Sequence, residues 1–428
     1  MGLYDALRAR EEAGNPIRLA LVGAGQMGAG MVSQMERMKG IRAMAVADII
    51  LKRVTSAYKE AGVPAEDVVV TAERRVAEEA LRKGKRVATT NGVLLTQLST
   101  IEVVVEASGV PEVGAQIAFN SILNRKHIVM LNVETDVTVG YVLKRMADAA
   151  DVVYTVSAGD EPGATKELYE FAMAMGFRVV AAGKGKNNPL NREATPDQLA
   201  AEAESKEMSP KMLCAFVDGT KTMVEMTALS NATGLVPEVR GMHGPFATVE
   251  QLPKIFSLKS QGGILEHEGV VDYVLGPVAP GVFVIVTTDQ KPIIKDMQYL
   301  HVGEGPNWVL YRPYHLANLE TPLSAARAVL MGETTIATVR KPVAETITVA
   351  KRDLKKGEKL DGIGQYTFYG SIEKADIAAR ERLLPLGLAQ GATLKTDIAK
   401  GEVITYDQVE LDYNSMIVHL RALQDRLD

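Results

Sequence analysis

The sequence lacks several features that define other classes of protein. Its one cysteine, Cys214, cannot form an internal disulfide framework, so we expect a packing role for it in a reducing cytoplasm. No run of 18 apolar residues occurs, and the first 17 residues are polar and charged, so we expect neither a membrane span nor a signal peptide. The net charge is −5 without a long basic block, which argues against a nucleic-acid partner.

A glycine turn between an apolar run and a helix-forming run is the clearest motif. Residues 17–22 predict a strand and residues 26–38 a helix, and the turn between them has the G-x-G-x-x-G spacing of a dinucleotide-binding loop. Free N–H groups at the helix start would face the phosphates. The residues expected to hold the cofactor here are Gly23, Ala24, Gly25, Gln26, Met27 and Gly28. The alternative is a glycine turn that binds no nucleotide.

An acidic residue stands where the adenosine ribose would lie. Residues 41–47 form a second apolar run that ends in Asp48, which is 20 residues after Gly28. A carboxylate at this position binds ribose hydroxyls and repels a 2′-phosphate, so Asp48 favours NAD. Arg53, five residues further on, could instead accept a 2′-phosphate and permit NADP, or it is a solvated surface residue.

Strand-like and helical runs alternate up to residue 156. The strand-like runs after the first two are 68–70, 86–89, 101–106, 127–131 and 152–156. This alternation predicts a Rossmann-type, doubly wound parallel sheet in an α/β protein. Ser108 and Gly109 would lie beside the nicotinamide ribose, and Asn132 and Glu134 would lie in the binding crevice. The alternative for the last two is capping of the helix that follows.

A lysine–asparagine loop is expected after the strand at residues 177–182. The segment 183–190 contains two lysines and two asparagines between glycines and a proline. Such a loop can bind a phosphate or a developing oxyanion, or it is an exposed basic turn. The substrate-binding candidates in it are Lys184, Lys186, Asn187 and Asn188.

Residues 215–226 predict a helix that carries ionisable side chains. On one helix, Asp218, Lys221 and Glu225 would share a face, and burial of three such groups is costly unless they serve a function. In the catalytic interpretation Lys221 protonates a carbonyl oxygen of the substrate. Asp218 and Glu225 orient the lysine, or one of them acts as general base. The alternative is an exposed, ion-paired face. Further substrate-binding candidates are Asn231, Arg312 and His315, the last two equally compatible with a dimer interface or a polar network.

The remaining chain predicts an α+β region and a small β-rich module. We expect a polar helix over residues 191–210, antiparallel strands at 271–275 and 281–288, and an amphipathic terminal helix over residues 413–428. Two similar phrases, at 353–360 and 397–404, mark the module. The expected domains are a cofactor domain (1–156), a catalytic and oligomerisation domain (157–342) and the C-terminal module (343–428).

These segments together resemble a known group of enzymes. The first two thirds are similar to homoserine dehydrogenase-like oxidoreductases, and the paired phrases near the end resemble a SAF domain. That combination resembles the deoxyxylulose phosphate reductoisomerase-like (DRL) family over nearly the whole chain. The segments 132–140, 183–190, 216–225 and 311–316 carry the more distinctive similarity. Asp218 and Lys221 are one residue closer together than the usual pair of homoserine dehydrogenases, which argues against homoserine as the substrate.

The resemblance implies a reaction and an assembly. It implies an NADPH-dependent isomerisation and reduction of 1-deoxy-D-xylulose 5-phosphate to 2-C-methyl-D-erythritol 4-phosphate, for isoprenoid precursors, by a cytoplasmic homodimer. The first alternative is an NAD(P)-dependent dehydrogenase of another small polyol, sugar or hydroxy acid. The second is a non-catalytic NAD(P)-sensing protein. The acidic residues could also take Mg²⁺ or Mn²⁺, although no spacing identifies the ligands.

Overall fold

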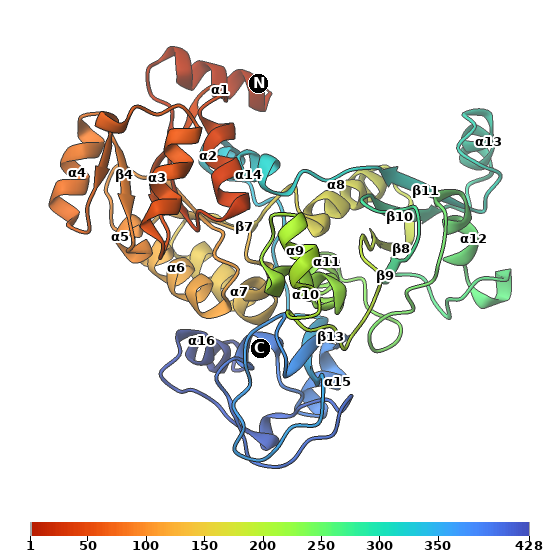
Figure 1. The fold of residues 1–428 in the computed structure, drawn as a ribbon. Coiled ribbons are helices and arrows are strands. Elements are labelled where there is room, and N and C mark those ends of the chain that lie inside the picture. The colour runs from red at the N-terminus through yellow and green to blue at the C-terminus, as the bar shows by residue number, and fades with distance from the viewer. Residues whose placement is uncertain (1, 428) are drawn as a thin grey trace. The chain divides into compact units, whose positions relative to one another are not determined.

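The computed structural model describes residues 2–427 and divides them into two compact units (Figure 1). The first unit contains residues 2–160, 316–339 and 415–427, and the second contains 161–315 and 340–414. The chain therefore passes between the units four times. The predicted domains are consecutive ranges, whereas these units are built from separated segments.

The first unit is organised around a seven-stranded parallel sheet. Its strand order is β3-β4-β2-β1-β5-β6-β7, the doubly wound arrangement expected from the sequence. Apolar residues of the central strands are fully buried because helices cover both faces. The strands are β1 (Ile17–Val22), β2 (Ile41–Ala47), β3 (Val68–Val70), β4 (Arg86–Thr89), β5 (Val103–Glu106), β6 (His127–Met130) and β7 (Tyr154–Val156).

Helices from three parts of the chain cover this sheet. α14 (Ala317–Met331) packs against α2, and α16 (Met416–Gln424) packs against α6 and α7. The amphipathic terminal helix is thus confirmed, and it packs on the first unit. The remaining helices are α1 (Leu3–Glu12), α2 (Gln26–Met35), α3 (Leu51–Glu60), α4 (Arg74–Arg82), α5 (Gly92–Thr96), α6 (Pro111–Leu123) and α7 (Val133–Ala149).

The second unit contains a four-stranded mixed sheet in the order β11-β10-β8-β9. Its strands are β8 (Arg178–Gly185), β9 (Val270–Val274), β10 (Val282–Thr287) and β11 (Asn307–Arg312). β10 is antiparallel to β8 and β11, but β9 runs parallel to β8. The prediction that β9 and β10 belong to an antiparallel sheet is therefore wrong for β9. The chain leaves β8 and returns through several helices, which allows the parallel pairing.

Short helices surround this sheet, and the polar segment before Pro210 is less helical than predicted. Only Ala200–Ser205 (α9) is α-helical between residues 191 and 209, because a Ser-Pro sequence starts a new helix at Pro210. The other helices of the unit are α8 (Glu161–Ala174), α10 (Pro210–Val217), α11 (Thr220–Thr233), α12 (Leu252–Ile255), α13 (Lys291–Tyr299) and α15 (Ala375–Arg380).

The two similar phrases pair with each other within residues 340–414. Asp353 accepts a hydrogen bond from the N–H of Lys400 (2.8 Å), and Asp397 accepts one from the N–H of Lys356 (2.8 Å). This reciprocal pattern explains why the sequence repeats. The strands nearby are β12 (Ala344–Ala350) with β13 (Phe368–Lys374), and β14 (Thr393–Leu394) with β15 (Val409–Glu410), each pair antiparallel.

Among the residues that the structure describes, no helix has both the length and the apolar character needed to cross a bilayer.

The third glycine of the dinucleotide motif, Gly28, is restricted by close packing at the end of β1. A Cβ atom on Gly28 would lie 2.0 Å from the carbonyl oxygen of Gly23, whereas a Cβ on Gly25 would meet no atom within 4 Å. Gly25 also has an ordinary φ of −69°. Only the first of these two positions therefore requires glycine for packing.

We predict that Gly28→Ala lowers the free energy of unfolding by about 1–3 kcal/mol, because the backbone of the turn must move to admit the methyl group. Gly25→Ala is the matched control and should change stability much less. Urea unfolding of both variants measures the difference. Equal stabilities would contradict the close packing.

A buried carboxylate anchors the loop between α11 and β9. Asp272, which is fully buried in β9, accepts hydrogen bonds from the backbone N–H of His243 (3.1 Å) and of Gly244 (2.9 Å). The Nδ1 atom of His243 lies 2.8 Å from the same carboxylate. This hydrogen bond and the charges of Asp272 and Glu238 raise the pKa of His243 above its ordinary value, against the effect of burial.

Because the folded-state pKa of His243 is raised, its protonated form stabilises the fold below about pH 6.5, and this stabilisation is lost as the pH rises through the folded-state value. We predict that His243→Gln costs about 1–2 kcal/mol at pH 5.5 and clearly less at pH 9. Urea unfolding across this range tests it, with the exposed His419→Gln as control. A cost that does not vary with pH would disprove the ion pair.

Candidate active site

The glycine turn and Asp48 are joined by backbone hydrogen bonds. Oδ2 of Asp48 accepts from the N–H of Ala24 (2.9 Å), and Oδ1 accepts from the N–H of Ile50 (2.8 Å). These bonds hold the carboxylate at the end of β2 beside the turn. Each oxygen retains a lone pair for a ribose hydroxyl, so the arrangement fits a dinucleotide. Gln26 and Met27 open α2, where the amide N–H groups of the first turn are not used within the helix.

Arg53 lies near Asp48 without forming a close ion pair. Its Nη1 atom is 3.8 Å from Oδ1 of Asp48, and 52% of its side chain is exposed. A carboxylate and a half-exposed guanidinium therefore lie together at the end of β2. The carboxylate suits ribose hydroxyls, and the guanidinium suits a 2′-phosphate.

The loops after β5 and β6 are tied together by one amide. Asn132 accepts from the N–H of Thr135 (3.2 Å), as the helix-cap alternative requires, and donates to the carbonyl of Val110 (3.0 Å). Ser108 and Gly109 lie in the first of these loops, and Gly109 has a positive φ of 68°. Glu134 is buried in the first turn of α7. These four residues therefore gather at the carboxyl edge of the sheet.

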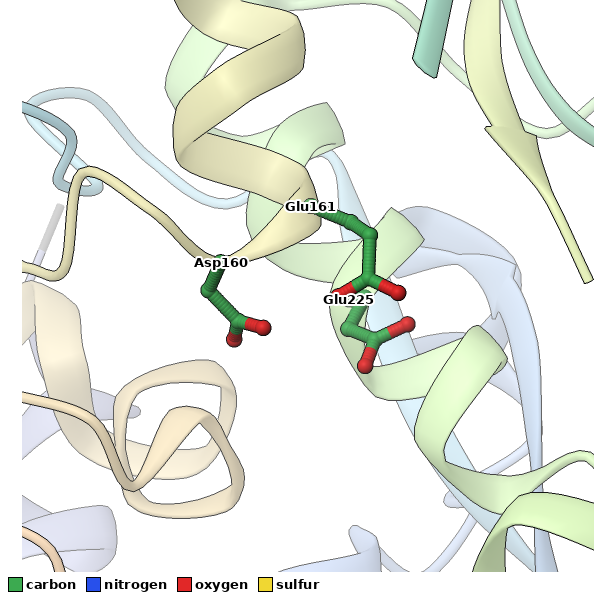
Figure 2. Close-up of side chains that lie close together, drawn as sticks. All are labelled: Asp160, Glu161 and Glu225. Atoms are coloured by element: carbon green, nitrogen blue, oxygen red, sulfur yellow. The ribbon is translucent and has the colours of Figure 1, made fainter. Parts of the chain in front are cut away.

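A buried lysine between two buried glutamates is the main feature of the second unit. Lys184 in β8 donates to Glu161, the first residue of α8 (2.5 Å), and to Glu225 on α11. Only 4%, 5% and 1% of these three residues are exposed, respectively. Figure 2 shows the carboxylates of Glu161 and Glu225 turned toward each other, from two different helices. Asp160, also labelled there, ends the first unit and is not counted in this cluster.

The position of Lys184 corrects one prediction. The sequence predicts a loop at Lys184, but strand β8 continues to Gly185. Gly183 and Gly185, on either side of Lys184, allow neighbouring backbone to approach closely. A Cβ on Gly183 would lie 1.8 Å from the carbonyl oxygen of Asp272 in the adjacent strand. The glycines therefore serve strand pairing, and the loop begins only at Lys186.

The electrostatics of the cluster favour proton exchange at a carboxyl group. Burial lowers the pKa of Lys184, but the two carboxylates outweigh it and raise the pKa overall. Burial and the neighbouring charge of Glu161 raise the pKa of Glu225, and Lys184 and Lys221 oppose this. One ammonium group thus contacts two buried carboxylates, and the raised pKa of Glu225 favours its protonated form more than that of an ordinary glutamate.

Two further predicted residues lie beside the cluster. Burial and the charge of Lys184 lower the pKa of Lys186 to about 8, and its Nζ atom donates to the carbonyls of Asn188 and Phe216, both at 2.7 Å. Nδ1 of His315 donates to the carbonyl of Pro280 (2.8 Å), which leaves Nε2 at 3.5 Å from Glu161. Lys221 lies one turn before Glu225 on α11.

Asp218 does not lie on the same helix as Lys221, so that prediction is wrong. α10 ends at Val217. Gly219, with a φ of 89°, interrupts the helical backbone before α11 begins at Thr220. Asp218 instead forms a buried ion pair with Lys351 (2.8 Å) from β12's C-terminal side and accepts from the N–H of Thr220 (2.9 Å). Lys351 also donates to the carbonyls of Ala194 and Gln365.

Four other substrate-binding candidates lie outside the cluster of buried charges. Asn231 accepts from the N–H groups of Val343 (2.9 Å) and Ala344 (3.0 Å), and so fixes the start of β12. Arg312 is 3.3 Å from Glu167 and lies over the ring of Tyr314. Asn187 and Asn188 occupy the loop that follows Lys186.

Sequence reasoning did not select Glu161 or Lys351 for the site. Glu161 stands at a strand-to-helix turn, Gly-Asp-Glu-Pro-Gly, and this position at the carboxyl side of a strand is the signal that could have identified it. Lys351 follows a buried strand and carries no comparable local signal.

Comparisons with known proteins agree with an enzymatic role. Residues 159–321 match a family model described as "Oxidoreductase DRL, catalytic domain". This segment contains Glu161, Lys184 and Glu225. The class of the protein follows from the match: it is an oxidoreductase. The non-catalytic sensor is thereby disfavoured.

Solved structures show remote similarity. A homoserine dehydrogenase from Thiobacillus denitrificans is 16% identical, with 91% of this chain and 98% of that chain covered and a TM-score of 0.45. A myo-inositol dehydrogenase from Corynebacterium glutamicum is 9% identical, with 74% and 90% covered and a TM-score of 0.42. No curated protein sequence matches this chain significantly.

We predict that Lys184→Met lowers the free energy of unfolding by about 3–5 kcal/mol, because it leaves two buried carboxylates without their cation. Lys206→Met is the matched control, since Lys206 forms an exposed pair with Glu202 that should contribute at most about 1 kcal/mol. Chemical unfolding at pH 7 compares the two. Similar losses would show that Lys184 does not compensate the glutamates.

Proposed function

We propose that the protein is an NAD(P)-dependent oxidoreductase that interconverts a small, phosphorylated or polyhydroxylated carbonyl compound and its alcohol. The observation that carries the proposal is the buried Lys184, Glu161 and Glu225 cluster within the segment that matches an oxidoreductase catalytic domain. The glycine turn with its anchored Asp48 supports a dinucleotide in the first unit.

The cofactor would be held by residues of the first unit alone. The turn from Gly23 to Gly28 would receive the pyrophosphate, and Asp48 or Arg53 would bind the ribose end. Ser108, Gly109, Asn132 and Glu134 would line the nicotinamide end of the crevice. A bound nicotinamide supplies or accepts the hydride. Asp48 favours NAD(H), and the resemblance to the DRL family favours NADP(H).

The second unit would manage the proton and the substrate. Lys221 would donate a proton from Nζ to the carbonyl oxygen as negative charge develops on it. Lys184 would fix the orientation of Glu225, whose raised pKa suits a carboxyl group that takes up or releases a proton. Lys186, with Asn187 and Asn188, would bind an anionic group of the substrate. Asp218, held by Lys351, would position the start of α11.

The specific reaction that we propose is the one that the family resemblance implies. In it, 1-deoxy-D-xylulose 5-phosphate is isomerised and reduced by NADPH and a proton to 2-C-methyl-D-erythritol 4-phosphate, by a homodimer in the cytoplasm. Glu225 would be the general base of the isomerisation, and the phosphate would lie at Lys186. Glu161 and Glu225 are the oxygen donors suited to Mg²⁺ or Mn²⁺, but Lys184 already compensates them, so a metal would have to compete with its ammonium group.

Cofactor oxidation with a defined substrate tests the proposal. Purified protein is mixed with NADPH or NADH, 1-deoxy-D-xylulose 5-phosphate and Mg²⁺ or Mn²⁺, and absorbance is followed. Turnover would support the specific reaction and identify the cofactor. Cofactor binding without turnover would exclude this substrate and direct the assay to other polyols, sugars and hydroxy acids.

We predict that Lys221→Ala lowers kcat by about 10²- to 10⁴-fold, the usual contribution of a positioned acid, and leaves the cofactor Kd nearly unchanged. The first unit alone is expected to bind the cofactor, which is why the Kd should not respond. Lys206→Ala is the control for loss of a lysine. Unaltered kcat in the Lys221 variant would refute its role as proton donor.

A further inference from the structure

A buried glutamate ends the strand beside the glycine turn. Glu106 is the last residue of β5, and it pairs in register with Val22 of β1 on one side and Met130 of β6 on the other. The chain continues from β1 to β2 in one direction and from β5 to β6 in the other, so Glu106 lies at the switch point where such sheets bind ligands.

The glycine turn touches the residue that follows Glu106. A Cβ on Gly23 would lie 2.6 Å from the carbonyl oxygen of Ala107, so the turn and the end of β5 are in close contact. A dinucleotide that follows the turn toward β6 must therefore pass the end of β5. Glu106 is the acidic residue that β5 contributes there.

The surroundings of Glu106 do not neutralise it. Glu106 is 0% exposed, and its Oε1 atom accepts a hydrogen bond from the N–H of Ser108 (2.9 Å). Its Oε2 atom has no hydrogen-bond partner among the described residues. Asn132, which caps the start of α7, and the negative charge of Glu134 in its first turn face it. Beyond them, Tyr154 of β7 donates to Asp136 (3.0 Å).

These contacts leave the charge of Glu106 finely balanced. Burial, with the nearby charge of Glu134, raises the pKa of Glu106 to about 7, while Ser108 and Asn132 favour the carboxylate form. A neighbouring positive charge would therefore convert the protonated group to a carboxylate near neutral pH. An oxidised nicotinamide ring is positively charged, whereas the reduced ring is neutral.

We propose that Glu106 determines the relative affinity of the crevice for oxidised and reduced nicotinamide cofactor. Its carboxylate attracts the cationic oxidised ring, and its protonated form does not distinguish the two rings. This inference rests on the proposed function, because it assumes that the first unit binds NAD(P). Binding of the oxidised form should then release a proton from Glu106, and binding of the reduced form should not.

The experiment measures the Kd of NAD⁺, NADH, NADP⁺ and NADPH for the full-length protein at pH 5.5 and 8.5. In the wild type, the affinity for the oxidised relative to the reduced form should rise roughly tenfold with pH, the size expected for one nearby charge. Glu106→Gln keeps an oxygen acceptor for Ser108 but cannot ionise. In this variant the ratio of the affinities for the oxidised and reduced cofactor should therefore not change with pH. Calorimetry in buffers of different ionisation enthalpy measures proton release independently.

Glu78→Gln is the matched control. Glu78 is also a buried glutamate of the first unit, and it accepts from the N–H and the hydroxyl of Ser99 (2.6 and 2.7 Å), before the amino end of β5. Loss of the Glu78 carboxylate should leave the pH dependence of the oxidised-to-reduced affinity ratio unchanged.

The outcomes separate the inference from the proposed function. The role of Glu106 alone would be overturned if the oxidised-to-reduced affinity ratio of the wild type did not change with pH. It would also be overturned if the ratio still changed with pH in Glu106→Gln. Failure of every cofactor form to bind the wild type would overturn both proposals. If Glu106→Gln does not fold, proton release by the wild type decides, because release on binding of the reduced form as well would contradict the inference.

Discussion

The compensation of two buried carboxylates by Lys184 is the interaction on which the second unit depends. α8 and β8 are consecutive in the chain and α11 lies further along, and each contributes one charged group to the same buried point. An uncompensated charge there would cost several kcal/mol, about as much as a typical domain has in total stability. The three elements are therefore held in one arrangement by charge as well as by apolar packing. A precise site for chemistry follows from the same constraint.

The sequence was sufficient for the parts of the fold that local pattern determines. The strand–turn–helix at Gly23 to Gly28, Asp48 at the end of β2 and the alternation up to β7 follow from apolar period and glycine spacing, which act over a few residues. The amphipathic α16 was predictable in the same way. Its packing site on α6 and α7 was not, because nothing local encodes a partner roughly 300 residues away in the chain.

The site was only partly predictable for the same physical reason. Glu225 stands out in the sequence as a charge among apolar residues and Lys184 as part of a lysine–asparagine segment, but their pairing across 41 residues is a property of the tertiary fold. Gly219 illustrates the limit. A helical pattern around it placed Asp218 and Lys221 on one face, yet a single residue with positive φ separates them into two helices, and Asp218 then pairs with Lys351, which is distant in sequence.

The two buried glutamates of special interest, Glu225 and Glu106, differ in what balances their charge. Glu225 contacts a lysine ammonium group, so its orientation is fixed whether or not it shares a proton with Glu161. Glu106 accepts from the backbone N–H of Ser108, which stabilises a carboxylate less than a full charge does. A group in the second situation responds to an external positive charge, and a group in the first resists it. In the proposed function, the first unit responds to the charge of a ligand, and the second holds a reacting group in place.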